Sequence, residues 1–118
     1  MTEQQATTEP SRHLEQFLDS LWLESGLSRN TVEAYRRDLL AFAGWLSEFD
    51  IDLAAATQQH IQRYQAQRMR EGRKVRSEAR LLSSLRRFYR YLIREDLRDS
   101  DPTAQLESPR RGKPFPDS

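Results

Sequence analysis

The segment that decides the fold is residues 77–96, which read SEARLLSSLRRFYRYLIRED. Its apolar residues recur three and four positions apart, as they do on one face of an amphipathic α-helix. This stripe consists of Leu81, Leu82, Leu85, Phe88, Tyr89, Leu92 and Ile93. The spacing predicts a helix from Ser77 to Asp96 that buries one face against the rest of the chain.

Another face of this predicted helix is rich in arginine. Successive residues of an α-helix are turned by about 100° around the axis, and this rotation gathers arginines beside the apolar stripe. They are Arg76, Arg80, Arg86, Arg87, Arg90 and Arg94. We expect Glu78 to be the only carboxylate on that outer face before Glu95. Because like charges one turn apart destabilise an isolated helix, we interpret the row as a surface that meets a polyanion.

Two helices are predicted upstream of this segment. The first runs from Ser11 to Glu24 and ends at Ser25-Gly26, and its expected core face is Leu14, Phe17, Leu18, Leu21 and Trp22. The second runs from Asn30 to Glu48, with Val32, Tyr35, Leu39, Phe42, Ala43 and Leu46 toward the core. Either Ser28 or Asn30 can act as its N-cap, since Asn30 and Glu33 have the spacing of a capping box.

A third helix and a final turn complete the predicted fold. Thr57 caps the third helix, Gly72 closes it, and its expected core residues are Ile61, Tyr64 and Met69. Asp101-Pro102 opens a short helical turn with Ala104 and Leu106 facing inward. The sequence therefore predicts an all-α domain, a small bundle of four main helices plus a short C-terminal helical turn.

Composition restricts the chain to one small domain and excludes several kinds of chemistry. The 118 residues are 36% apolar and 31% charged, and the mean hydropathy is −0.88. No apolar run is long enough to cross a membrane and no secretory signal is recognisable, so we expect a cytoplasmic protein without a membrane partner. The absence of cysteine excludes a disulfide framework, a thiolate zinc site and a thiol nucleophile.

The net charge of +1 conceals a strong asymmetry along the chain. Residues 1–60 carry 4 basic and 10 acidic side chains, whereas residues 61–94 carry 11 basic and 2 acidic ones. A concentrated positive field attracts polyanions. A helix is about 10–12 Å across and fits the major groove of B-DNA, so the basic helix and the loop before it, which contains Lys74, predict binding to double-stranded DNA.

Several segments resemble the N-terminal core-binding domain of tyrosine site-specific recombinases. They are residues 14–19 (LEQFLD), 21–24 (LWLE), 30–31 (NT), 34–39 (AYRRDL), 79–83 (ARLLS), 86–92 (RRFYRYL) and 101–102 (DP). The resemblance implies a SAM-like helical domain over residues 11–107, preceded by a disordered tail over 1–10. Residues 108–118 would then be an interdomain linker, and the catalytic domain would be absent from this chain.

The resemblance also implies which residues contact DNA. The family's contacts fall on Thr31 and Arg37 of the second helix, and on Arg76, Arg80, Ser84 and Arg87 of the fourth. Thr31 and Arg37 share a face near the start of the second helix, where backbone N–H groups also favour phosphate. The implied function is sequence-specific DNA binding as one half of a clamp, in a heterotetramer with a related recombinase.

Catalytic and metal sites are not expected in this chain. Tyr35 and Tyr89 fall on core faces, whereas Tyr64 and Tyr91 are expected to be partly exposed without an activating cluster. His13 and His60 stand on different helices without further ligands at metal-binding spacing. We therefore expect no catalysis by this chain alone, no metal, no cofactor and no small-molecule ligand.

Two alternatives to DNA binding stay open. The arginine row of a helical protein-interaction module would instead meet an acidic protein partner. An RNA-binding protein would present exposed aromatic stacking platforms, which the placement of aromatic residues mainly on core faces does not favour. If five or six arginines neutralise phosphates, log affinity for DNA falls with log salt concentration with a slope near −5.

Overall fold

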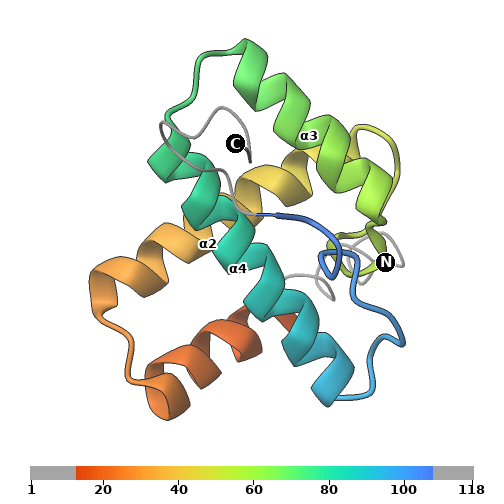
Figure 1. The fold of residues 1–118 in the computed structure, drawn as a ribbon. Helices are drawn as coiled ribbons and strands as arrows, with labels where there is room; N and C mark the ends of the chain where they lie inside the picture. Colours follow the sequence, from red (N-terminus) through yellow and green to blue (C-terminus); the bar gives the residue numbers. More distant parts are fainter. Residues whose placement is uncertain (1–12, 108–118) are drawn as a thin grey trace.

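Residues 13–107 fold into a bundle of four helices in which α4 lies across α2 (Figure 1). The structure is a computed structural model that describes residues 13–107. Helical residues 13–20 continue into the π-helical turn η1 (Leu21–Ser25), which is followed by α2 (Arg29–Ser47), η2 (Leu53–Ala55), α3 (Gln58–Arg70) and α4 (Val75–Arg94). No strand occurs between residues 13 and 107, and the predicted all-α class is confirmed. The predicted tail at 1–10 and linker at 108–118 lie outside the described residues.

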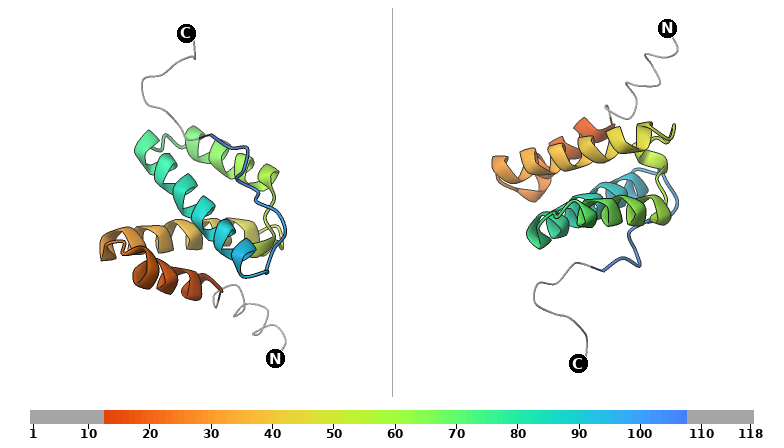
Figure 2. Two further views of the ribbon diagram at one scale, coloured as in Figure 1. Left: turned by 60° about the horizontal axis from the view of Figure 1, so that its bottom comes forward. Right: turned by 90° about the horizontal axis from the view of Figure 1, so that it is seen from above.

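The helices are arranged in two layers. Figure 2 shows the N-terminal helix and α2 in one layer and α3 and α4 in the other. Aromatic rings join the layers, since the ring centroids of Phe42 on α2 and Tyr64 on α3 are 4.9 Å apart. Phe17 of the N-terminal helix meets Phe88 of α4 edge-on at 5.4 Å. The core therefore lies between the two layers.

The apolar stripe of α4 is buried as predicted. Six of its residues are at most 1% exposed, namely Leu81, Leu82, Leu85, Phe88, Tyr89 and Leu92. Ile93 is half-buried. The hydroxyl of Tyr89 donates to the carbonyl of Leu53 at 2.5 Å, and burial raises the pKa of this phenol. α4 is thus the central element, and its remaining surface is left to polar side chains.

The N-terminal helix deviates from the prediction at its end. Leu14, Phe17, Leu18 and Leu21 are buried as expected, but Trp22 is 48% exposed. The hydrogen bonds of a π-helix span five residues and widen the turn, so Trp22 does not reach the position that a regular α-helix would give it. Gly26 ends the segment with φ +67°, a conformation that glycine adopts without steric cost.

Ser28 caps α2, which resolves the choice between Ser28 and Asn30. The Ser28 hydroxyl accepts from the backbone N–H of Thr31 at 3.2 Å. Asn30 lies inside the first turn and therefore cannot act as the N-cap. All of the predicted core residues of α2 contribute to the core, with Ala43 partly buried.

The prediction for α3 was wrong at one core position and that for α4 was wrong at Glu78. Met69 is 71% exposed and Arg68 is buried in its place. The Arg68 Nε donates to Glu78 Oε2 at 2.6 Å, with both side chains less than one-tenth exposed. Glu78 therefore lies in the core rather than on the outer face of α4. Thr57 caps α3 as predicted, and His60 completes a capping box with it.

The C-terminal turn is present but faces differently from the prediction. Asp101 Oδ1 accepts from the backbone N–H of Thr103 at 2.8 Å, as expected of an Asp before a turn. Leu106 is buried as predicted, whereas Ala104 is exposed and Thr103 is buried instead.

Removing the N-cap hydroxyl tests the start of α2. Ser28→Ala should lower the free energy of unfolding by about 1 kcal/mol, because an orphan N–H of the first turn loses its acceptor. Asn30→Ala is the matched control, and it should change stability by less than half as much, in urea titrations followed by circular dichroism. Equal losses in both variants would show that Ser28 is not the functional cap.

The buried ion pair between α3 and α4 gives a second stability prediction. Arg68→Met leaves the Glu78 carboxylate buried without a partner and should cost about 3–5 kcal/mol of unfolding free energy. The double variant Arg68→Met, Glu78→Leu replaces both charges by apolar groups and should be close to wild type. Chemical denaturation of Arg68→Met, Glu78→Leu and the double variant measures the coupling energy between the two side chains. A double variant as unstable as Arg68→Met would contradict this assignment.

Candidate nucleic-acid interface

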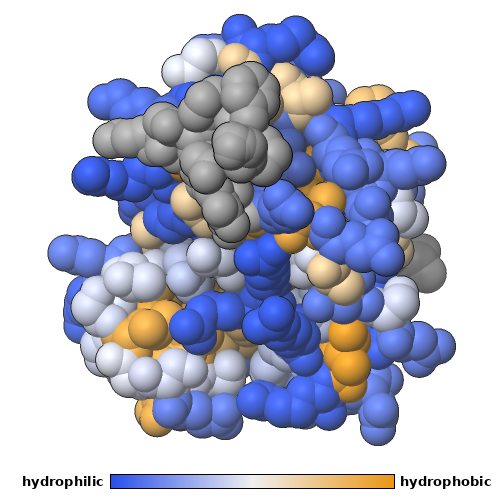
Figure 3. Space-filling view, in the orientation of Figure 1, coloured by the Kyte–Doolittle hydropathy of each residue, from blue (hydrophilic) through white to orange (hydrophobic). Residues whose placement is uncertain are grey.

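The outer face of α4 is a continuous polar stripe. Its exposed residues recur at helical spacing along the whole element and are Arg76, Ser83, Arg87, Arg90 and Arg94. Figure 3 shows hydrophilic side chains along the middle of the face that α4 crosses. The described part of α4 presents no carboxylate on this stripe, because Glu78 is buried. The predicted one-sided placement of arginine is therefore present.

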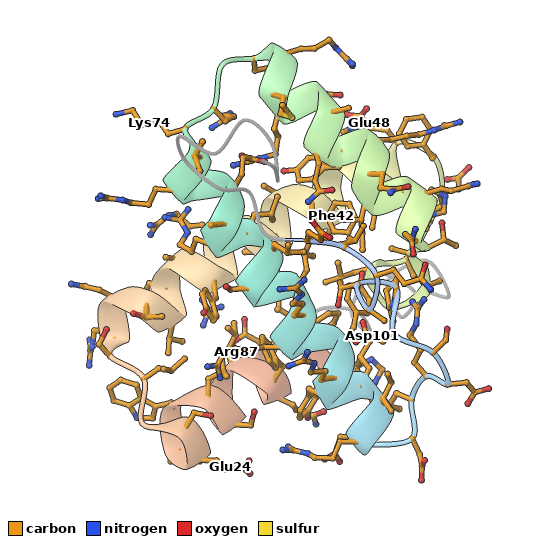
Figure 4. The ribbon with its side chains drawn as sticks, viewed as in Figure 1. Glu24, Phe42, Glu48, Lys74, Arg87 and Asp101 are labelled. Atoms are coloured by element: carbon orange, nitrogen blue, oxygen red, sulfur yellow. The ribbon has the colours of Figure 1, made fainter. Side chains whose placement is uncertain are left out.

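Three predicted cations on α4 and the preceding loop are exposed and unpaired. Lys74, Arg76 and Arg87 make no ion pair or side-chain hydrogen bond with any residue between 13 and 107. Figure 4 shows Lys74 at the start of α4 and Arg87 farther along the same helix. Free guanidinium and ammonium groups of this kind keep all their donors for an external anion. These three residues form the cationic centre of the candidate interface.

The start of α2 supplies the neighbouring part of the surface. Arg37 is exposed and has no polar partner among residues 13–107. Thr31 is half-buried, and its hydroxyl accepts from the Ser28 hydroxyl at 3.0 Å. Ala34, which lies between these two residues in the sequence, is 8% exposed and belongs to the buried side of α2.

The crossing of α2 and α4 is bridged by Arg80 and Asp38. Arg80 Nε donates to Asp38 Oδ2 at 2.8 Å, and Arg80 Nη2 donates to Oδ1 at 2.9 Å. These hydrogen bonds raise the pKa of the Arg80 guanidinium, which therefore stays charged. The Asp38 side chain is 6% exposed and that of Arg80 is 40% exposed. Arg80 thus reaches the candidate surface with its charge largely neutralised.

The structure corrects the placement of Ser84 at the surface. Ser84 is completely buried, and its hydroxyl donates to the carbonyl of Leu81 at 2.7 Å. It lies on the buried side of α4, which also carries Phe88, rather than on the arginine face. A buried hydroxyl with its hydrogen directed to the backbone is not available to DNA, so Ser84 is excluded from the candidate interface.

Several other arginines of the basic region are held by acceptors. Arg94 lies 3.4 Å from Glu24 and 3.3 Å from Glu95, and Arg73 lies 3.4 Å from Glu71. Of these pairs, only Arg94–Glu24 joins two elements that are distant in the sequence, and helical spacing does not reveal it. Arg86 donates to the carbonyl of Leu106. The full row of six arginines is therefore not equally free to meet a polyanion.

A groove between η1 and α4 extends the basic surface. It has a volume of about 360 Å³ and is lined by Phe17, Ser20, Leu21, Glu24, Ser25, Arg87, Arg90, Tyr91 and Arg94. Arg90 is 69% exposed in its side chain and lies 4.0 Å from Asp101, a long contact that leaves its donors accessible. No sequence pattern predicts this groove, because it depends on how the N-terminal helix packs on α4.

The tyrosine side chains pack in or beside the core, and His60 caps a helix. Tyr35 and Tyr89 are buried as predicted, and Tyr91 is partly exposed. Tyr64 is 5% exposed, which confirms its predicted place among the core residues of the third helix and excludes partial exposure. The Nδ1 atom of His60 accepts from the backbone N–H of Thr57 at 3.0 Å, which is a helix-capping role.

Between residues 13 and 107, no group of three or more histidine and carboxylate side chains is placed to hold a metal ion. Over the same residues, no helix combines the length and the apolar character needed to cross a membrane.

Comparison with known proteins identifies the family. Residues 14–96 match the phage integrase N-terminal SAM-like domain. The chain is 50% identical over 103 residues to a protein named tyrosine recombinase XerD from Yersinia pestis, covering 87% of this chain and 34% of that protein. It is 51% identical over 105 residues to the protein of the same name from Pseudomonas putida, covering 89% of this chain and 35% of that protein.

These relatives are much longer than the chain. The chain spans about one third of the length of the curated relatives it matches. The matched family region, residues 14–96, contains both α2 and α4 with their buried faces and their cationic side chains. The chain therefore belongs to the phage integrase N-terminal SAM-like domain family.

Proposed function

We propose that the chain binds double-stranded DNA as the N-terminal half-clamp of a XerD-like tyrosine recombinase. The observation that carries this proposal is the set of unpaired cations on adjoining elements. Arg37 on α2 and Lys74, Arg76 and Arg87 on or next to α4 have no polar partner among residues 13–107. Unpaired Lys and Arg side chains neutralise phosphates and release counterions, which is the main source of non-specific DNA affinity.

The dimensions of α4 suit this role. The helix has 20 residues, and at 1.5 Å per residue it is about 30 Å long. An α-helix fits the major groove, where side chains reach base edges while flanking cations contact phosphates. The arginine face of α4 would enter the groove, and Arg37 of α2 would contact the adjacent backbone.

The wider biological role that the family resemblance implies is part of the same proposal. A second domain of a longer protein would supply the catalytic residues and hold the opposite side of the duplex. The intact recombinase would act in a heterotetramer with a XerC-like recombinase, in site-specific recombination. Chromosome dimer resolution and segregation at cell division, within the cytoplasm at the nucleoid, would be the setting.

An acidic protein is the competing partner. The ion pairs of Arg80 and Arg94 show that guanidinium groups of this surface pair with carboxylates. DNA is favoured because the free cations lie along one straight helix and on an element that crosses it, which suits a long regular anion. Competition between duplex DNA, single-stranded RNA and an acidic protein distinguishes the three partners.

The salt dependence of binding tests the proposal quantitatively. Four cations of the candidate interface have no polar partner among residues 13–107, so the slope of log affinity against log salt should be near −4 for duplex DNA, somewhat less steep than −5. Arg87→Ala and Arg37→Ala should each make the slope shallower by about 1 and weaken binding. Fluorescence anisotropy with a labelled duplex at several salt concentrations measures both quantities.

A matched control is available on α3. Arg63 is exposed, and α3 contributes no residue to the candidate interface, so Arg63→Ala removes the same charge elsewhere. This control should leave the slope nearly unchanged. A slope near −1 for the wild-type chain, or equal effects of Arg63→Ala and Arg87→Ala, would contradict the proposed interface.

A further inference from the structure

Asp38 is an acidic residue in the middle of a cationic surface. It follows Arg37 in sequence, and its partner Arg80 lies one helical turn after Arg76. The carboxylate is almost fully buried and is held by two hydrogen bonds of 2.8 and 2.9 Å from one guanidinium. A negative charge at this place weakens the attraction of the surface for phosphate. Its presence therefore calls for an explanation other than affinity.

The geometry of the pair leaves Arg80 partly available. A guanidinium has five N–H donors, and the bidentate contact with Asp38 uses one on Nε and one on Nη2. The Arg80 side chain is 40% exposed, so its remaining donors are open to an external acceptor. Because Asp38 is buried on α2, it fixes the plane of the guanidinium relative to both helices.

We propose that Asp38 is a positioning residue that orients Arg80 for sequence discrimination rather than for affinity. The inference rests on the proposed DNA-binding function. A fixed arginine fork matches the acceptor pair on the major-groove edge of guanine, and a wrong base leaves its donors unpaired. An arginine already held in one rotamer also loses less conformational freedom on binding. Asp38 therefore lowers the general attraction of the surface for DNA and raises its selectivity at one base.

The two possible roles of Asp38 predict opposite effects of Asp38→Asn on binding. If Asp38 is only a repelling charge, its neutralisation strengthens binding to every duplex by the same factor. If Asp38 positions Arg80, neutralisation reduces the preference for the correct sequence, while affinity for other sequences stays the same or rises.

The experiment compares two duplexes for the full 118-residue chain. One carries a sequence that the chain enriches from a random pool, and the other carries the same bases shuffled. The ratio of their dissociation constants, measured by anisotropy, is the discrimination. Asp38→Asn should reduce this ratio by about tenfold, the size of one good arginine–guanine contact. Asp52→Asn, which neutralises an exposed carboxylate without a side-chain capping bond, is the matched control and should leave the ratio unchanged.

Two further variants separate positioning from a structural role. Arg80→Lys keeps the positive charge but loses the fork, so it should lower the discrimination while the affinity for the shuffled duplex stays close to wild type. In an Arg80→Ala background, Asp38→Asn should have no additional effect on the ratio. Thermal unfolding of each variant shows whether it is folded at the temperature of the binding assay.

The outcomes distinguish this inference from the proposed function. Binding to duplex DNA without any enriched sequence, or an equal gain in affinity for both duplexes in Asp38→Asn, overturns the positioning role and leaves DNA binding intact. A change in thermal stability with an unchanged ratio in both Asp38→Asn and Arg80→Lys also overturns it. Failure of the wild-type chain to bind any duplex overturns the proposed function as well.

Discussion

The packing of α4 against α2 is the constraint on which the rest of the structure depends. α4 gives Leu81, Leu85 and Phe88 to the core, so its arginines must occupy the opposite side. The crossing is fixed a second time by the ion pair between Asp38 and Arg80. Hydrophobic burial therefore decides which face of α4 is presented, and the ion pair defines how that face meets α2.

Local patterns predicted the helices, while contacts between distant residues escaped prediction. The repeat of apolar residues defines a helix and its buried face from neighbours within two turns, and this information located α2 and α4 within a few residues. The pairing of Arg68 with Glu78 depends on the packing of α3 against α4, which no periodicity describes. For this reason Met69 was placed in the core and Glu78 on the surface, and both were wrong.

The site was predictable to the same extent. Helical rotation identified the arginine face of α4, and exposure of Lys74, Arg76 and Arg87 agrees with it. Ser84 was predicted to contact DNA only from the family resemblance, and close packing on its side of α4 buries it. Which cations are neutralised depends on partners far away in sequence, since Arg80 and Asp38 are 42 residues apart.

Two ion pairs join the oppositely charged halves of the chain in the folded molecule. Glu24 and Asp38, from the acidic half, pair with Arg94 and Arg80 from the basic half. Interactions between exposed charges decay within about 10 Å at 0.1 M salt, so a bound polyanion responds to the local balance and not to the net charge. Pairing confines the strongest positive potential to the few cations without acceptors. A small domain with a net charge near zero can thereby present a localised polyanion-binding surface. Positive charge spread evenly over the whole surface would not be localised in this way.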